Sequence, residues 1–349
     1  GHIDSRVSDV MNATLDAPGA NDDGSGTAAV IEAARVLSKH KFLGTIVYAV
    51  LMGEEQGLFG GKLLANYARA QGWNVIANLN NDIIGNSCGS DGVCDAKTVR
   101  VFSEGPRWQG HEELAKAQRS LGGENDSPSR NISRFLDSLA ERHPEIGLDV
   151  MQVWRNDRFG RGGDHTELLN AGYPAVRLSV AVENYDQQHQ DVRVEKGKHF
   201  GDTAEVMDFA YLAKVTKLNT AALAALASAP PPPEPSVEGA VSTATTVSWE
   251  PQISGRNYII RWRRTDASRW QEGRRVRVSP PASQSECGLP REMLAAPRAK
   301  PGCVITLPSI RVDDWVFGVS SVSADGFESP VASAVPGGAF KPYVAPEKN

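Results

Sequence analysis

Two adjacent glutamates, Glu54 and Glu55, stand between Gly53 and Gly57, directly after an apolar, β-branched run. That run, residues 45–51 (TIVYAVL), predicts a buried strand, and the glycines allow the backbone to turn sharply after it. Because neighbouring side chains diverge, one carboxylate can bind a metal ion while the other moves a proton. An isolated Glu-Glu pair is more often an exposed charged turn. Its interpretation therefore depends on the residues that accompany it.

Two segments near the start of the chain carry further metal-ligand types. The chain opens with His2-Ile3-Asp4, in which the carboxylate of Asp4 could fix the tautomer of the His2 imidazole. A stray N-terminal histidine is the alternative. Residues 18–26 (PGANDDGSG) form a turn-rich loop that contains Asp22 and Asp23. Two aspartates and three glycines exceed what an ordinary helix N-cap requires, so we expect this loop to bind a cation.

Two more segments complete a set of metal ligands. Asp82 follows a predicted strand over residues 74–79, and His189 lies in a polar segment that follows another predicted strand, residues 173–180. Two imidazoles and three carboxylates suit a pair of zinc ions that share one bridging carboxylate. Such a pair can share a hydroxide and polarise a carbonyl, which leaves Glu54 free to act as the general base. The ligand types gathered in this way are His2, Asp22 or Asp23, Glu55, Asp82 and His189.

The surrounding elements predict the fold that positions these residues. Apolar periodicity predicts alternating helices and strands, which favours an α/β fold with a mixed, largely parallel sheet flanked by helices. In such sheets, ligands bind beyond the carboxyl ends of the strands, where Glu54, Glu55, Asp82 and His189 fall. The predicted helices cover residues 27–40, 58–71, 109–121, 129–142 and 203–229, and the predicted strands cover residues 45–51, 74–79, 97–103 and 173–180.

A change of pattern marks a second domain. Residues 1–229 form the predicted catalytic domain, and residues 230–236 form a stiff proline-rich linker. Residues 237–336 contain short strands with turn signals, which predict a small all-β sandwich before a tail at residues 337–349. The predicted strands are residues 245–249, 258–262, 275–278, 302–307 and 315–322. The segments VSW (247–249), YIIRW (258–262) and FGVSSVSADG (317–326) resemble a fibronectin type III domain.

Composition limits the class of protein. The chain has 349 residues, 40% of them hydrophobic, as in an ordinary globular protein. A net charge of −5 and a pI near 5.9 argue against a nucleic-acid partner. No apolar run approaches the roughly 18 residues of a membrane span.

Seven arginines lie between Arg261 and Arg277, and we expect an exposed strand face there. A cell-surface or polysaccharide contact through this domain is the alternative.

The cysteines and the first residue bear on the compartment. Four cysteines fall into two local pairs, Cys88 with Cys94 and Cys287 with Cys303. We expect two disulfides and hence a secreted or periplasmic protein. The chain begins at Gly1 without an initiator methionine, so we expect a processed or truncated form.

Across nearly all of residues 1–228, the sequence resembles the two-zinc secreted aminopeptidases, a family that also includes glutamate carboxypeptidase and the transferrin receptor. Order and spacing of the motifs both fit, although each motif alone is short. The matching segments are residues 1–5 (GHIDS), 18–26 (PGANDDGSG), 53–60 (GEEQGLFG), 81–82 (ND), 163–165 (GDH) and 185–189 (YDQQH).

The resemblance implies a role for each matching residue. It implies that Glu54 is the general base, that Asp4 orients His2, and that Asp164 and His165 support the site without binding metal. Here Gln188, rather than a tyrosine, precedes the last ligand, so Tyr185 is the candidate for stabilising the oxyanion. The family also has a substantial stretch before its His-x-Asp strand. The implied zinc ligands are His2, Asp22 as the bridge, Glu55, Asp82 and His189.

The resemblance implies a zinc-dependent aminopeptidase that acts on peptides with a free N-terminus. Three alternatives share the fold: a glutaminyl cyclase with one zinc ion and three of the ligands, a carboxypeptidase acting on acidic C-terminal residues, and a non-catalytic binding protein. Retention of both His2 and Asp82 favours two zinc ions and hydrolysis.

Overall fold

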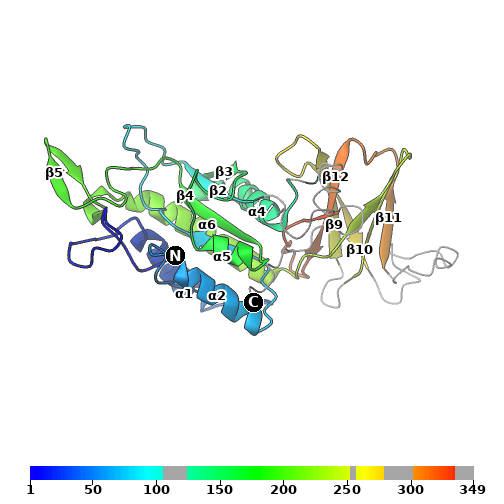
Figure 1. Ribbon diagram of the computed structural model, residues 1–349. Coiled ribbons are helices and arrows are strands. Elements are labelled where there is room, and N and C mark those ends of the chain that lie inside the picture. Colours follow the sequence, from blue (N-terminus) through cyan, green and yellow to red (C-terminus); the bar gives the residue numbers. More distant parts are fainter. Residues whose placement is uncertain (105–122, 124, 252–256, 279–301, 335–349) are drawn as a thin grey trace.

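A computed structural model describes residues 1–104, 123, 125–251, 257–278 and 302–334, which form an α/β part and a β-rich part side by side (Figure 1). The α/β part is built on a four-stranded sheet in the order β1-β4-β2-β3. The pairs β1/β4 and β2/β3 are parallel, whereas β2/β4 is antiparallel. The predicted mixed, largely parallel sheet is therefore confirmed. Its strands are β1 (Asn78–Asn81), β2 (Thr98–Phe102), β3 (Asp149–Val153) and β4 (Ala175–Val180).

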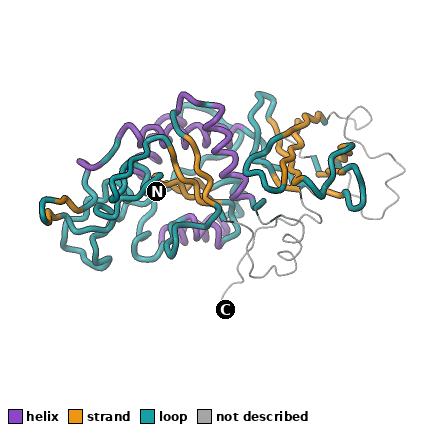
Figure 2. The backbone as a smooth tube through the Cα atoms, turned by 90° about the horizontal axis from the view of Figure 1, so that it is seen from above, coloured by secondary structure: helices purple, strands orange, loops and turns teal. Residues whose placement is uncertain are grey.

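Helices cover both faces of this sheet (Figure 2). All six residues of β4 are buried, because helices pack on each side of this central strand. Apolar side chains of α1, α4 and α6 share one core cluster with β2 and β4, whereas α2 and α5 pack together against the other face. The helices are α1 (Gly24–Leu37), α2 (Phe59–Ala70), α4 (Pro128–Arg142), α5 (His165–Asn170) and α6 (Phe209–Ser228).

Local capping explains where several helices begin. The side chain of Asp23 accepts a hydrogen bond from the amide of Gly26, so α1 begins three residues before the predicted start. Asp208 caps α6 in the same way. The predicted helix over residues 203–229 is divided by this cap into a short 3₁₀ turn, η2 (Ala204–Val206), and α6. The helix predicted over residues 109–121 lies outside the described residues.

The run at residues 45–51 does not form the buried strand that its composition predicts. Within the described residues, its ladder bonds join only Leu51 to the first residues of the chain, at 2.9 Å from Ile3 N to Leu51 O and 2.9 Å from Leu51 N to Gly1 O. Val47 and Val50 are exposed. The prediction of a buried strand is wrong here, because β propensity is realised only where a neighbouring strand pairs with the backbone. Likewise, the strand predicted over residues 74–79 begins only at Asn78.

Three short elements complete the α/β part. A 3₁₀ turn, η1 (Pro144–Ile146), follows α4, and a hairpin of β5 (Arg193–Glu195) and β6 (Lys198–Phe200) projects at the end away from the β-rich part (Figure 1).

The β-rich part consists of two sheets, in the orders β10-β9-β12-β13 and β11-β8-β7. Both sheets contribute to one hydrophobic core, which contains Trp249 and Val247 from one sheet and Ile260 and Phe317 from the other. This arrangement is that of a sandwich, while the resemblance to fibronectin type III and the predicted domain boundaries stay predictions. The strands are β7 (Ser236–Glu238), β8 (Thr245–Trp249), β9 (Asn257–Arg264), β10 (Glu272–Arg277), β11 (Cys303–Leu307), β12 (Trp315–Val322) and β13 (Ala332–Ala334).

Two ion pairs, one of them buried, join the two parts at α4 and at the residues just before it. Arg263 of β9 is 1% exposed, and its Nη2 donates to both carboxylate oxygens of Asp126 at 2.7 Å. Arg269 makes a two-point contact with Asp137 of α4, at 2.6 and 2.7 Å. The expectation of an exposed arginine face is therefore wrong for Arg263, because the α/β part covers it. Part of the arginine cluster serves to hold the two parts together.

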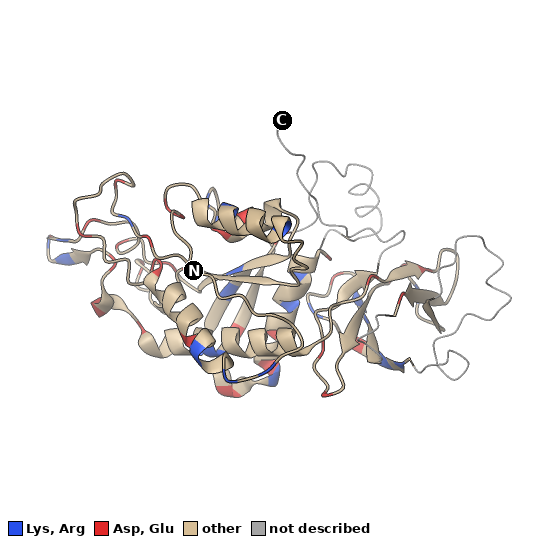
Figure 3. Ribbon diagram, turned by 90° about the horizontal axis from the view of Figure 1, so that it is seen from below, with Lys and Arg blue, Asp and Glu red and all other residues tan. Residues whose placement is uncertain are grey.

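The disulfide between Cys88 and Cys94 is confirmed. The second predicted pair includes Cys287, which lies outside the described residues. Among the described helices, none is long and apolar enough to cross a membrane. Lysine and arginine are interspersed with aspartate and glutamate along the ribbon in both parts (Figure 3).

Candidate metal centre

The residues predicted to bind metal converge at one edge of the sheet. Asp82 directly follows β1, and the segment that carries His189 follows β4, so both lie at the carboxyl ends of two parallel strands. Asp22 stands just before α1 at the same edge, next to the N-terminal His2. The fold thus brings together residues separated by up to 187 positions in the sequence, as the position of ligand sites in such sheets leads one to expect.

These residues form two groups that share Asp22. In the first group, one donor atom each of His2, Asp22 and Asp82 lies within 4.8 Å of the others, and in the second the same holds for Asp22, Glu55 and His189. Asp22 presents one oxygen to each imidazole: Oδ1 lies 3.3 Å from His2 Nε2, and Oδ2 lies 2.9 Å from His189 Nε2. This is the arrangement that a carboxylate bridging two cations requires.

The donor atoms fit a pair of zinc ions. The Nδ1 atom of His2 lies 2.9 Å from the backbone oxygen of Asp4, so it carries the ring proton and Nε2 keeps its lone pair. Both His2 Nε2 and Glu55 Oε1 are buried and make no hydrogen bond of good geometry within the described residues. Each faces another member of the cluster instead, Asp22 Oδ1 at 3.3 Å and His189 Nε2 at 3.1 Å respectively, as donor atoms around a cation would. Nitrogen from two imidazoles and oxygen from three carboxylates is a donor set that suits zinc.

Asp4 fastens the Glu54–Glu55 turn to the first residues of the chain. Its Oδ1 accepts hydrogen bonds from the amides of Gly53 (2.8 Å) and Glu54 (3.3 Å), and its Oδ2 accepts one from the amide of Glu55 (3.1 Å). The carboxylate lies 3.6 Å from His2 Nδ1, whereas the backbone oxygen of Asp4 makes the short contact with the ring. One residue thus positions a predicted ligand and the predicted base together.

The loop before α1 is held by two further carboxylates. Asp23 accepts hydrogen bonds from the amides of His2 (3.0 Å) and Gly26 (3.0 Å), which agrees with a supporting role rather than a ligand role. Asp202 accepts bonds from the amides of Asn21 and Asp22, the latter at 2.7 Å. Asp202 was not predicted to support the site, because nothing in its local sequence distinguishes it from an exposed acidic residue.

Burial and crowding of the carboxyl groups shift the pKa values of several side chains in the site. Burial, together with the nearby Asp82 carboxylate, raises the pKa of Glu54 to about 9. Burial would lower the pKa of His189, but its contacts with Asp22 and Glu55 raise it to about 9. Glu54 also lines a pocket of about 290 Å³ that opens onto the cluster. Acidic groups packed this closely need cations to be stable as anions.

The pocket contains Gln188 and not Tyr185. The side-chain amide of Gln188 lies on the pocket wall, with Nε2 3.3 Å from Asp22 Oδ2. Tyr185 is 60% exposed and does not line this pocket. Gln188, which the sequence analysis noted only as a departure from the family pattern, is therefore better placed to donate a hydrogen bond to a bound substrate.

Asp164 and His165 support the site from behind. Asp164 accepts a hydrogen bond from the amide of Gly61 in α2 at 3.0 Å. His165 Nε2 contacts the backbone oxygen of Asn156 at 2.9 Å, and burial lowers the pKa of this imidazole. Both residues thus fasten the loop 154–163 to neighbouring elements, and neither belongs to the two metal-ligand groups.

Sequence analysis also missed three arginines beside the cluster. Arg177 of β4 is fully buried, and its Nη2 donates to Asp82 Oδ1 at 2.7 Å. Arg158 and Arg161 come from the loop RFGRGG and line the pocket. An arginine inside an otherwise apolar strand was the available signal for Arg177. Arg158 pairs with its neighbour Asp157, but the other carboxylate partners of these arginines lie 20 to 95 positions away, so their roles could not be read from the sequence.

Comparisons with known proteins agree with this geometry. A family model described as "Peptidase family M28" matches residues 1–208. A "Probable zinc metalloprotease" of Leptosphaeria maculans is 40% identical over 97% of this chain and 73% of its own length. Relatives with the same description from Pyrenophora tritici-repentis and Pyricularia oryzae are each 40% identical over 97% of this chain. The chain spans 66% and 64% of the lengths of these two relatives.

Among solved structures, the Legionella pneumophila LapA aminopeptidase is 21% identical, with a TM-score of 0.40 over 60% of this chain and 48% of its own.

Proposed function

The chain belongs to peptidase family M28, and we propose that it is a zinc metallopeptidase that releases N-terminal residues from peptides. The observation that carries this proposal is the pair of ligand groups that share Asp22, with Glu54 on the wall of the adjoining pocket. A single metal would leave one of the two groups without a cation. The shared carboxylate therefore supports two ions.

The chain's own residues would bind and orient the reacting groups. His2, Asp22 and Asp82 would hold one zinc ion, and Asp22, Glu55 and His189 would hold the other. When bound, such ions polarise the scissile carbonyl and lower the pKa of an attacking water.

Glu54 would accept the proton of that water and deliver it to the leaving amine. Without bound cations, burial and the neighbouring Asp82 carboxylate raise the pKa of Glu54 to about 9. Bound zinc ions would lower this pKa, so that Glu54 is an anion able to accept a proton near neutral pH. The three hydrogen bonds from the amides of residues 53–55 to Asp4 hold the backbone that carries Glu54 in one position beside the ligand groups. Gln188 would donate its amide hydrogen to the substrate oxygen.

The test is a paired hydrolysis assay. Aminoacyl chromogenic anilides with a free amine are compared with the same compounds after N-acetylation, each with added zinc and with a chelator. Turnover of the free-amine set alone, abolished by the chelator, is the expected result. Turnover of the acetylated set at the same rate would contradict an aminopeptidase.

A pair of variants tests the role of Glu54. Because general-base catalysis contributes about 10²–10⁴-fold, Glu54→Gln should lower kcat by at least that lower factor. Glu145→Gln is the matched control, since Glu145 has a 70% exposed side chain and lies in η1, outside the pocket. Full activity of Glu54→Gln would remove this residue from the mechanism.

Two further measurements separate an aminopeptidase from alternatives on this fold. Cyclisation of an N-terminal glutamine peptide with one bound zinc ion would indicate a glutaminyl cyclase. Zinc binding without any turnover would indicate a binding protein.

The local disulfide between Cys88 and Cys94 supports a secreted or periplasmic location, because such bonds persist in oxidising compartments. We also retain a cell-surface or polysaccharide contact for the β-rich part as a proposal.

A further inference from the structure

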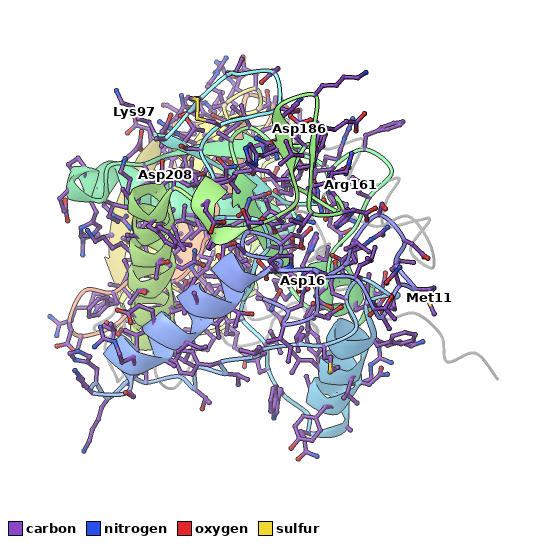
Figure 4. The ribbon with its side chains drawn as sticks, turned by 90° about the vertical axis from the view of Figure 1, so that its left-hand side faces the viewer. Met11, Asp16, Lys97, Arg161, Asp186 and Asp208 are labelled. Atoms are coloured by element: carbon purple, nitrogen blue, oxygen red, sulfur yellow. A yellow bond between two sulfur atoms is a disulfide. The ribbon has the colours of Figure 1, made fainter. Side chains whose placement is uncertain are left out.

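The pocket beside the metal-ligand groups is lined by basic as well as acidic side chains. Glu54 and the metal-ligand carboxylates line it, and so do Arg158 and Arg161 of the loop 154–163. Figure 4 looks onto the end of the α/β part opposite the β-rich part and shows Arg161 among the loops of that end. Neither arginine has a task in the hydrolytic step proposed above.

These arginines belong to a network with an excess of positive charge. Arg100, Arg158 and Arg161 all contact Glu183, at 2.7, 3.4 and 2.6 Å respectively. Burial alone would raise the pKa of Glu183, but the three guanidinium groups hold it below its ordinary value, so this carboxylate is ionised. One carboxylate thus faces three cations, and its charge does not neutralise all of them.

The remaining carboxylates of the network are already used. Asp157 pairs with Arg158 at 3.0 Å and with Arg177 at 3.2 Å. Asp82 pairs with Arg177 and is one of the proposed zinc ligands. Four arginines therefore share three carboxylates, one of which also serves the metal centre. The surplus charge favours an anion.

Arg161 is the member of this network that faces the pocket with free donors. Its side chain is 30% exposed, against 9% for Arg158. In the described part of the chain, the hydrogen bonds of its side chain involve Nη1 alone, which donates to Glu183. The planar guanidinium thus keeps Nε and Nη2 for a two-point contact with a carboxylate.

The loop that carries Arg161 is fixed before any ligand binds. The amide of Arg161 donates to the backbone oxygen of Arg158 at 3.2 Å. The backbone oxygen of Gly162 accepts bonds from Arg158 Nη2 (3.2 Å) and from Arg177 Nη1 (2.9 Å). A donor group held in this way loses little conformational entropy on binding, which strengthens the contact.

We propose that Arg161, with Arg158 behind it, forms a subsite for a carboxylate of the substrate in the same pocket as the metal centre. The pocket volume of about 290 Å³ lies at the lower end of small-ligand sites, which favours short peptides. The carboxylate is the C-terminal group of a short peptide or an acidic side chain. This inference rests on the proposed peptidase function.

The test compares substrates that differ in one charge. A dipeptide with a free C-terminus is compared with its C-terminal amide, and a dipeptide amide with aspartate in second place is compared with its asparagine counterpart. We expect kcat/KM to favour the charged member of one pair by roughly tenfold or more, as a charge-assisted two-point contact implies. The pair that shows the preference identifies the source of the carboxylate.

Variants assign that preference to Arg161. In Arg161→Gln the ratio of kcat/KM between the charged and the neutral substrate of the preferred pair should fall towards one. In Arg161→Lys this ratio should be partly retained, because the positive charge remains but the planar two-point donor group is lost. Arg193→Gln is the matched control: Arg193 is 38% exposed, pairs with Glu195 and does not line the pocket, so its ratio should equal that of the wild type. A general loss of folding would lower both rates and leave the ratio unchanged.

A second measurement needs no variant. Hydrolysis of a neutral aminoacyl anilide by the zinc-loaded wild type is inhibited with N-acetyl-leucine and with N-acetyl-leucinamide. Stronger inhibition by the free acid is expected.

Equal ratios in the wild type, or an unchanged ratio in Arg161→Gln, would overturn the subsite while the peptidase function stands. Absence of turnover with every substrate would contradict the peptidase function itself, and the subsite with it.

Discussion

Arg177 and Asp82 form a fully buried ion pair, with Arg177 Nη2 2.7 Å from Asp82 Oδ1, directly behind the proposed metal centre. The same guanidinium contacts Asp157 and the backbone oxygen of Gly162. One side chain in β4 therefore orients a predicted zinc ligand and also holds the loop that carries Arg158 and Arg161. The metal centre and the pocket wall share this support.

Replacing Arg177 by methionine should weaken zinc binding. The change removes the ion pair that orients Asp82, whereas Asp157 keeps its pair with Arg158. Loss of such an outer partner typically costs 10–100-fold in metal affinity. Competition with a chelator measures the zinc Kd. Arg35→Met is the control, since Arg35 pairs with Glu32 on the exposed surface of α1, and a zinc Kd of Arg177→Met equal to that of this control would refute the coupling.

Asp202→Ala should also weaken zinc binding, through the backbone of the loop. The Asp202 carboxylate accepts hydrogen bonds from the amides of Asn21 and Asp22, which set the position of Asp22, the residue common to the two ligand groups. We expect a 10–100-fold rise in the zinc Kd, as for other outer partners of metal ligands. Asp202→Asn, which keeps one acceptor oxygen, should show a smaller rise. Equal values for the two variants would mean that the hydrogen bonds do not matter.

Asp126→Asn should destabilise the whole chain, because it leaves Arg263 buried without a counter-charge. Removing one partner of a buried ion pair typically costs about 3–5 kcal/mol. Denaturant unfolding measures the loss. Glu328→Gln, which breaks the partly exposed pair with Arg261, should cost less. A loss below about 1 kcal/mol for Asp126→Asn would mean that the two parts do not depend on this contact.

The contribution of Glu183 should depend on pH. Its pKa lies below the ordinary value because of Arg158, Arg100 and Arg161, despite a burial that acts the other way. A carboxyl group with a depressed pKa in the folded state stabilises the protein above its ordinary pKa, and this stabilisation is lost as the pH falls through the folded value.

Glu183→Gln should therefore lower the free energy of unfolding near pH 7, and the difference from the wild type should shrink as the pH falls below about 4. Urea unfolding of both proteins in the presence of chelator measures this. If the two proteins differ in free energy of unfolding by the same amount near pH 7 and below about pH 4, the ionised carboxylate of Glu183 is not the source of the stabilisation.

The features that could be predicted from the sequence are those set by residues close together in the chain. Asp82 stands directly after β1, so the α/β pattern alone predicted its place at one edge of the sheet. Glu54 and Glu55 stand in the predicted turn, although the run before them is not the predicted buried strand. The start of α1 differs from the prediction because Asp23 caps the helix earlier than its apolar face begins. Turns, strand ends and helix caps can be predicted because they depend mainly on residues that are neighbours in the sequence.

What could not be predicted depends on partners far away in the chain. Arg177 and Asp82 are 95 residues apart, and Arg263 and Asp126 are 137 residues apart. Nothing local shows that these arginines are buried, since arginine is normally exposed. Residues 45–51 illustrate the opposite error: their composition is that of a strand, but within the described residues only Leu51 finds a pairing partner.

The most direct test of the central claim is the number of zinc ions that the chain binds when hydrolysis is at its maximum. The metal-free protein is titrated with zinc while bound metal and turnover of a free-amine substrate are measured together. Two ions per chain, with full activity reached only at the second, is the predicted result. Asp22→Asn, which alters the carboxylate common to both groups, should bind fewer ions and lose activity. Full hydrolysis with one ion, or with none, would contradict the account.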